Sequence, residues 1–116
     1  MTWSFDDNLP IYLQIIHILK YELARGKYQP GEKLPAVREL AMTAGVNPNT
    51  MQKALAELER DGLVKSQRTA GRFVTDDKEK IMEVAKTLAY DEIARMVENI
   101  SSLGYRKEEI PQLIEK

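Results

Sequence analysis

The stretch AVRELAMTAGVNPNTMQKALAELER, residues 36–60, decides the fold. Apolar residues recur at helical spacing on both sides of Gly45. Asn47 and Pro48 open the second of these helices, because asparagine can cap first-turn N–H groups and proline needs no N–H at the first helical position. Gly45 ends the first helix. The sequence therefore predicts two helices joined by a tight turn, as in a helix-turn-helix.

The flanking segments extend this motif on both sides. Residues 10–25, PIYLQIIHILKYELAR, predict a helix that begins at Pro10 and ends before Gly26. After residue 60, the segments LVKSQ and RFVT surround RTAG and predict a β-hairpin, with Val64 and Phe73 facing inward. Three helices followed by a hairpin describe a winged helix. A plain surface hairpin that only closes the core fits the same pattern.

The composition changes after Thr75, where a helical tail is predicted. Asp76 and Glu79 resemble a capping box, and apolar residues then recur at threes and fours over residues 77–103. A last short helix is expected to start near Glu109, because Pro111 would break a helix that began earlier. The predicted fold is mainly α with a small β-hairpin: a winged helix-turn-helix domain at residues 1–75 and a C-terminal helical dimerisation segment at residues 76–116.

Composition narrows the class of protein. The 116 residues are 43% hydrophobic and 30% charged, with a net charge of −1 and no cysteine. Residues 1–75 carry ten Lys and Arg against eight Asp and Glu, whereas residues 76–116 carry seven against ten. There is no long apolar run and no signal-peptide pattern at the start. We therefore expect a cytoplasmic protein that makes no contact with a membrane.

The residues of an enzyme are missing from the sequence. His17 is the only histidine and lies among apolar residues of a predicted helix, where a packed or surface imidazole is the usual case. No glycine-rich phosphate loop, nucleophile elbow or His/Cys cluster occurs. We expect no catalytic residue, no metal site and no cofactor, so the chemistry must be that of recognition.

The start of the helix at residues 48–60 suggests what is recognised. Asn49, Thr50, Gln52 and Lys53 place polar groups on its first turns. In a helix-turn-helix these turns meet base edges in the major groove, where Asn and Gln pair with adenine, and Lys or Arg with guanine or phosphate. An ordinary solvated helix start would show the same residues. The sequence favours DNA because three arginines are expected on the same side: Arg38, Arg68 and Arg72.

Residues 31–74, from GEKLPAVRELA through VNPNT to GRFV, resemble the DNA-binding domain of GntR-family bacterial transcription regulators. The resemblance covers about residues 9–75, and several motif blocks match at the right spacing. The VNPNT segment and the short two-helix tail resemble the YtrA-like subfamily. This resemblance implies a homodimer held by its C-terminal helices that binds a pseudo-palindromic operator on double-stranded DNA. Such regulators usually act as repressors, often of transporter operons.

Carried over by position, the resemblance also assigns roles to single residues. It makes Gln52 a base reader and places Arg68 in the wing near the minor groove. It implies further DNA contacts at four residues: Arg38, Asn47, Asn49 and Thr50.

The sequence departs from the family pattern at several positions. Ala36 stands where a capping serine is common, which should weaken that helix start by roughly 0.5 to 2 kcal/mol. Pro48 and Gln52 occupy positions that are arginine in many members, so we expect operator preference to move from guanine towards adenine or thymine. In the hairpin, Thr69 replaces the usual glycine and Arg72 the usual threonine.

The tail helix is expected to form the dimer interface. Leu88 and Met96 are the main candidates, and Ile81, Val84 and Ile100 continue their surface. Alternatively, this helix only folds back on Ile16 and Ile18 of its own chain. Because the tail is too short for a separate sensory domain, any small-molecule effector, whose identity the sequence leaves unknown, should bind between helices at the dimer interface.

Two other functions fit a winged helix. One is a protein-interaction module without specific DNA readout. Such a module should carry an apolar patch where this chain has five polar or charged residues: Asn49, Gln52, Lys53, Arg68 and Arg72. The other is nonspecific packaging of DNA, which should require a much more basic chain, because sequence-independent affinity comes from phosphate neutralisation.

Overall fold

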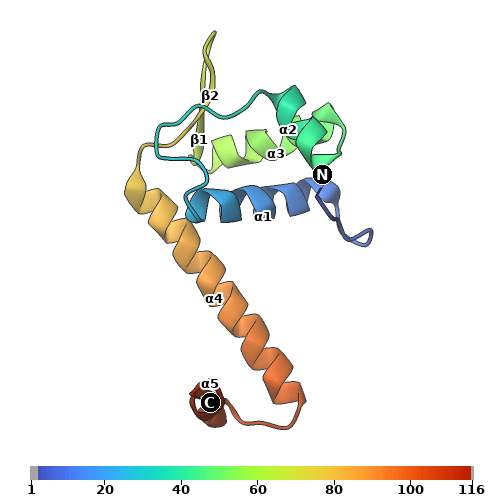
Figure 1. Ribbon diagram of the computed structural model, residues 1–116, viewed down its shortest axis with the longest axis vertical. Helices are drawn as coiled ribbons and strands as arrows, with labels where there is room; N and C mark the ends of the chain where they lie inside the picture. Colours follow the sequence, from blue (N-terminus) through green and yellow to red (C-terminus); the bar gives the residue numbers. More distant parts are fainter. Residues whose placement is uncertain (1–2, 116) are drawn as a thin grey trace. The chain divides into compact units, whose positions relative to one another are not determined.

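The computed structural model describes residues 3–115 and shows a helical chain with one two-stranded antiparallel sheet (Figure 1). The elements in order are α1 (Ile11–Ala24), α2 (Val37–Ala44), α3 (Pro48–Arg60), β1 (Val64–Gln67), β2 (Gly71–Val74), α4 (Lys78–Ser102), the 3₁₀-helix η1 (Lys107–Glu109) and α5 (Ile110–Ile114). The predicted fold class, mainly α with a winged helix-turn-helix, is confirmed. The contacts divide the chain into two compact units, one ending at Ala85 and the other starting at Lys86.

The core of the first unit lies where α1, α2, α3 and the hairpin meet. Helix α3 packs against α1, α2 and β1. The hairpin extends away from the helices in Figure 1. The largest fully buried side chains of this unit include Ile15 of α1, Met51, Leu55 and Leu58 of α3, and Val64 and Val74 of the hairpin. The apolar stripes that predict the helices therefore do form one core.

The hairpin corrects the prediction for Phe73. Val64 pairs with Val74, and Lys65 pairs with Phe73. Because side chains alternate between the two faces of a strand, Val64 and Val74 share one face and Phe73 lies on the other. Val64 and Val74 are buried, whereas Phe73 is half-buried. The inward partner of Val64 is therefore Val74, and the prediction that Phe73 faces inward is wrong.

The start of α4 corrects a second prediction. Asp77, and not Asp76, caps this helix: its Oδ1 accepts the N–H groups of Glu79 at 3.1 Å and Lys80 at 3.3 Å. Asp77 is itself held in place, because its N–H donates to Oγ1 of the buried Thr75 at 3.1 Å. The helix therefore starts one residue later than a capping box at Asp76 would place it.

The residues predicted for a dimer interface have three different environments. Ile81 and Val84 are half-buried against the core of the first unit. Leu88 is only 7% exposed in the single chain, and Ile110 of the same unit is also buried. Met96 and Ile100 are half-buried. Among the described residues, no helix is both long and apolar enough to cross a membrane.

Candidate nucleic-acid interface

The turn between α2 and α3 exposes the start of α3. Gly45 adopts a left-handed conformation, with φ of 75°, and its N–H donates to the carbonyl of Ala41 at 2.8 Å. An L-residue adopts this conformation only at a cost, which explains the glycine. Asn47 Oδ1 then accepts the N–H of Asn49 at 2.7 Å, and Pro48 occupies the first helical position. The predicted cap and turn are confirmed.

The first turns of α3 present polar side chains to solvent. Asn47, Asn49, Gln52 and Lys53 are exposed, and Thr50 is half-buried. Met51, Ala54 and Leu55 lie on the opposite side of the helix and are buried. The burial of that apolar stripe fixes which face of α3 is free, so the predicted polar face is the one that a DNA duplex can reach.

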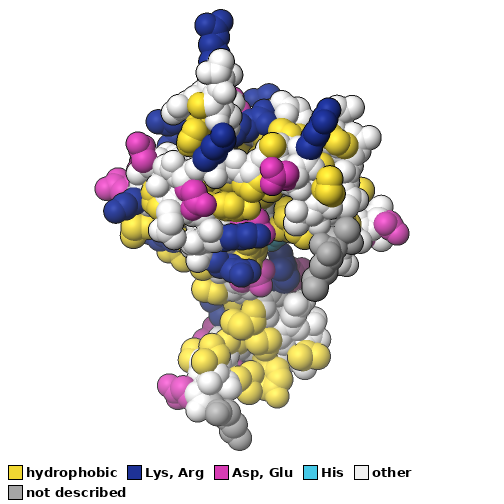
Figure 2. Space-filling view, turned by 45° about the horizontal axis from the view of Figure 1, so that its top comes forward, with side chains coloured by type: hydrophobic (Ala, Val, Ile, Leu, Met, Phe, Trp, Pro, Cys, Tyr) yellow, Lys and Arg dark blue, Asp and Glu magenta, His cyan; other side chains and the backbone are white. Residues whose placement is uncertain are grey.

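Two of the predicted arginines are exposed and unpaired. Arg38 lies on α2, and Arg68 lies in the turn between β1 and β2. Within residues 3–115 neither guanidinium takes part in an ion pair or a side-chain hydrogen bond. Figure 2 shows a basic side chain at the tip of the hairpin, and Arg68 is the only basic residue of that turn. Both arginines are therefore free to bind phosphate.

Arg72 differs from these two because its side chain is bound within the protein. Its Nη1 donates to Gln52 Oε1 at 3.1 Å, and its Nε donates to Glu59 Oε1 at 3.1 Å. Only 17% of the Arg72 side chain is exposed. The structure thus brings the predicted site residues Gln52 and Arg72 together, but it directs Arg72 at helix α3 and pairs its charge with a carboxylate.

Glu59 completes this network as an ionised group. Ser66 Oγ donates to Glu59 Oε1 at 2.7 Å. The hydrogen bond from Ser66 and the hydrogen bond from Arg72, in that order of importance, lower the pKa of the Glu59 carboxyl below its usual value. A carboxylate that accepts two hydrogen bonds favours its charged form. Glu59 therefore anchors Arg72 at neutral pH.

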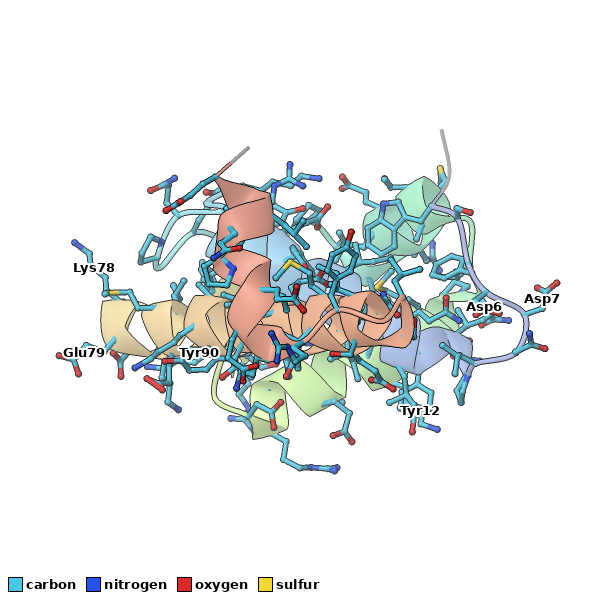
Figure 3. The ribbon with its side chains drawn as sticks, turned by 90° about the horizontal axis from the view of Figure 1, so that it is seen from below. Asp6, Asp7, Tyr12, Lys78, Glu79 and Tyr90 are labelled. Carbon is cyan, nitrogen blue, oxygen red and sulfur yellow. The ribbon has the colours of Figure 1, made fainter. Side chains whose placement is uncertain are left out.

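Lys53 is also held by a neighbour. Its Nζ lies 3.9 Å from the centre of the Tyr12 ring, which is within the range of a cation–π interaction. Tyr12 extends outward from α1 (Figure 3). Lys53 as a residue remains exposed, so the ring holds the lysine charge beside the start of α3 without burying the residue.

The predictions from the sequence do not include Glu59, Ser66 and Tyr12 in this site. One signal was present: Gln52 and Glu59 are seven residues apart, which is about two helical turns, so they share one face of α3. The contributions of Ser66 and Tyr12 depend on how the hairpin and α1 pack, and no local spacing indicates them.

A comparison with protein families matches residues 11–74 to the bacterial regulatory proteins of the gntR family. The chain belongs to the GntR family. The matched region runs from the start of α1 to the end of β2 and so contains the whole candidate interface. The chain is thus a winged-helix DNA-binding transcription regulator of a class that has no enzymatic activity, as the sequence predicts.

Relatives of similar length support this GntR assignment. The chain is 40% identical over 110 residues to YhcF, an HTH-type transcriptional regulator of Bacillus subtilis, covering 95% of this chain and 91% of YhcF. It is 34% identical over 110 residues to YtrA, an HTH-type transcriptional repressor of the same organism, covering 94% of this chain and 85% of YtrA. The predicted likeness to YtrA is thus found along most of both chains.

Solved structures share the GntR fold. A GntR family transcriptional regulator from Listeria monocytogenes has a TM-score of 0.87 and 39% identity, covering 96% of this chain and 97% of that one. The DNA-binding domain of AraR, solved in complex with its operator ORE1, has a TM-score of 0.56 and 30% identity, covering 65% of this chain and 94% of that one. A DNA complex is thus known for a domain similar to the first unit.

Proposed function

We propose that this GntR-family regulator is a homodimeric repressor of the cytoplasm that binds a pseudo-palindromic operator. The observation that carries the proposal is the exposed, polar start of α3 in a domain whose hairpin tip bears an arginine with no partner within residues 3–115. The name of YtrA as a repressor and the operator complex of AraR support it.

Each interface residue has a proposed role that follows from its position. Gln52 reads a base edge in the major groove, because it is exposed near the start of α3, five residues after the cap Asn47, where a recognition helix meets DNA. Arg38 and Arg68 bind phosphate or the minor groove, because their guanidinium groups are unpaired in the described chain. The remaining contacts come from the start of α3: Asn47, Asn49, Thr50 and Lys53.

The second unit supports the proposal of a homodimer. Several large apolar side chains are exposed there, including Tyr90 at 60%, Ile93 at 51% and Leu103 at 75%. Figure 2 shows hydrophobic side chains gathered over this part of the chain. Apolar surface of this kind is covered in dimeric proteins. A two-fold operator also requires two recognition helices about 34 to 36 Å apart, which a dimer supplies.

The interface that we propose differs in part from the predicted one. Met96 and Ile100 remain candidates because they are half-buried on the second unit, next to the exposed Ile93. Leu88, Ile81 and Val84 are already covered by their own chain, so a partner subunit would gain little by contacting them. Their role in dimerisation stays a prediction, and a structural role within one chain explains their burial.

Selection of bound fragments from random DNA tests the proposed function. The selected sites should contain two inverted half-sites, and light scattering should give the mass of two chains. A site placed over a promoter should lower transcription when the protein is added, and higher transcription would contradict a repressor.

Two variants test the contacts. Gln52→Ala should lose roughly 1 to 3 kcal/mol of binding free energy on the selected operator and relax the base preference at one position. Arg38→Ala should weaken binding to all DNA sequences. It should also make the slope of log affinity against log salt concentration shallower by about one unit. Equal losses on operator and random DNA for both variants would contradict these roles.

A further inference from the structure

A hydrogen bond from Arg72 occupies one end of the Gln52 amide. A guanidinium group only donates hydrogen bonds, so the Gln52 atom that lies 3.1 Å from Arg72 Nη1 must be the carbonyl oxygen. This contact fixes the orientation of an amide that could otherwise flip. The NH₂ group of Gln52 makes no hydrogen bond within the described chain, so it is the free end of the side chain.

We propose that Arg72 is a positioning residue for base recognition: it holds Gln52 with its NH₂ donors free, and the chain therefore reads guanine at this position. The inference rests on the proposed function, in which Gln52 contacts a base. Guanine presents two neighbouring acceptors, N7 and O6, in the major groove, and the two N–H donors of one amide match them.

Adenine fits this arrangement less well. An adenine pairs with glutamine through its N7 acceptor and its N6 amino donor, so it requires the glutamine carbonyl as well as the NH₂ group. In this protein the carbonyl already accepts from Arg72. The adenine amino group would have to approach the same oxygen beside a cation, which repels its partly positive hydrogens. With its carbonyl occupied by Arg72, Gln52 offers DNA only the hydrogen-bond donors of its NH₂ group.

The rest of the network keeps Arg72 in this position. Glu59 Oε1 binds Arg72 Nε at 3.1 Å and Ser66 Oγ at 2.7 Å, so one carboxylate oxygen joins the hairpin to α3. Ser66 and Arg72 are opposite each other in the register of β1 and β2 and therefore lie on the same face of the hairpin. With its charge paired and its side chain 17% exposed, Arg72 is poorly placed to act as a phosphate contact.

The test is selection from random DNA with the full chain, followed by sequencing, for the unmodified protein and three variants. Gln52→Ala identifies the position that Gln52 reads. In the unmodified protein that position should be a G·C pair. Arg72→Met keeps an apolar stem of similar length but removes the hydrogen-bond donors of the side chain. It should raise the ratio of A·T to G·C pairs selected at that position by roughly tenfold. Arg60→Met is the matched control, because it makes the same change at an arginine of α3 whose Nη1 pairs with Glu57 Oε1 at 2.8 Å and touches neither Gln52 nor Glu59, and it should keep the G·C preference.

The outcomes separate this inference from the proposed function. If Gln52→Ala relaxes no position, Gln52 does not read a base, and both fail. If Gln52→Ala relaxes a position that is an A·T pair in the unmodified protein, only the inference about Arg72 is overturned, and this result needs no variant of Arg72. An unchanged G·C preference in folded Arg72→Met would also overturn it. Arg72→Met could also keep the base preference while the slope of its log affinity against log salt concentration becomes shallower by about one unit. That result would identify Arg72 as a phosphate contact.

Discussion

At the scale of single residues, Asn47 has a structural task beside its proposed DNA contact. Its Oδ1 accepts the N–H of Asn49 at 2.7 Å and so caps α3. Asn47→Ala should lower the free energy of unfolding by about 1 kcal/mol, because the N–H loses its partner. Urea unfolding followed by circular dichroism measures this loss.

Asn49→Ala is the matched control for that variant. The Asn49 side chain is exposed and makes no hydrogen bond within the described chain, because only its backbone N–H takes part in the cap. This variant should keep its stability and lose affinity for the operator. If both variants were equally stable, the cap would contribute nothing to folding.

Glu59 should make stability depend on pH in the acid range. Its pKa in the folded protein lies below the ordinary value of 4.5, chiefly because Ser66 and Arg72 donate to it. Its contribution to stability is therefore complete above that ordinary value and is lost as the pH falls through the lower, folded-state pKa. Urea unfolding between about pH 6 and pH 3 should show a shallower decline for Glu59→Gln than for the unmodified chain. Curves that fall in parallel would rule out this role.

At the scale of elements, the start of α4 depends on one of two neighbouring aspartates. Asp77 accepts the N–H groups of Glu79 and Lys80, whereas the Asp76 side chain accepts no hydrogen bond within the described chain. Asp77→Ala should therefore destabilise the protein by about 1 kcal/mol. Asp76→Ala removes the same charge one residue earlier and should have little effect. Thermal unfolding of the two variants compares them directly, and equal losses would mean that charge near the helix end matters more than the cap.

At the scale of the whole molecule, the proposed dimer interface predicts how a monomer can be made. Tyr90 and Ile93 are exposed at 60% and 51% in the single chain. Tyr90 is labelled on α4 in Figure 3. Changing both to lysine should leave each chain folded and separate the subunits. Binding to the full operator should then weaken, because the second half-site is no longer held at a high effective concentration. Light scattering and titration with full and half operators measure the two effects.

Leu13→Lys is the control for this variant. Leu13 lies on α1 of the first unit and is exposed at 48%, so it is a similar change on a different surface. It should remain dimeric. A Tyr90 and Ile93 double variant that still has the mass of two chains would show that the dimer interface lies elsewhere.

The sequence by itself determined the helix-turn-helix. Gly45, Asn47 and Pro48 act through their own backbone and through partners no more than four residues away, so the ends of α2 and α3 could be predicted. The apolar period of each helix likewise showed which face is buried and, by difference, which face is free. These features are local, and local chemistry is visible in the order of residues.

Only the tertiary structure showed which of the predicted site residues contact each other. Gln52 of the recognition helix and Arg72 of the second strand are both positions where this chain departs from the family pattern, and they are hydrogen-bonded to each other across twenty residues of sequence. The departures at Pro48 and Gln52, interpreted without Arg72, predict a shift towards adenine or thymine, whereas the proposed effect of the Arg72 contact is a preference for guanine.

The burial of Leu88 and the half-burial of Ile81 and Val84 were hidden from the sequence for a related reason. An apolar stripe shows that a helix face is covered, but it does not show by which surface. A helical period repeats along one axis and carries no information about the neighbour on the other side. That neighbour is fixed by the packing of segments far apart in the chain, and this packing exists only once the chain is folded.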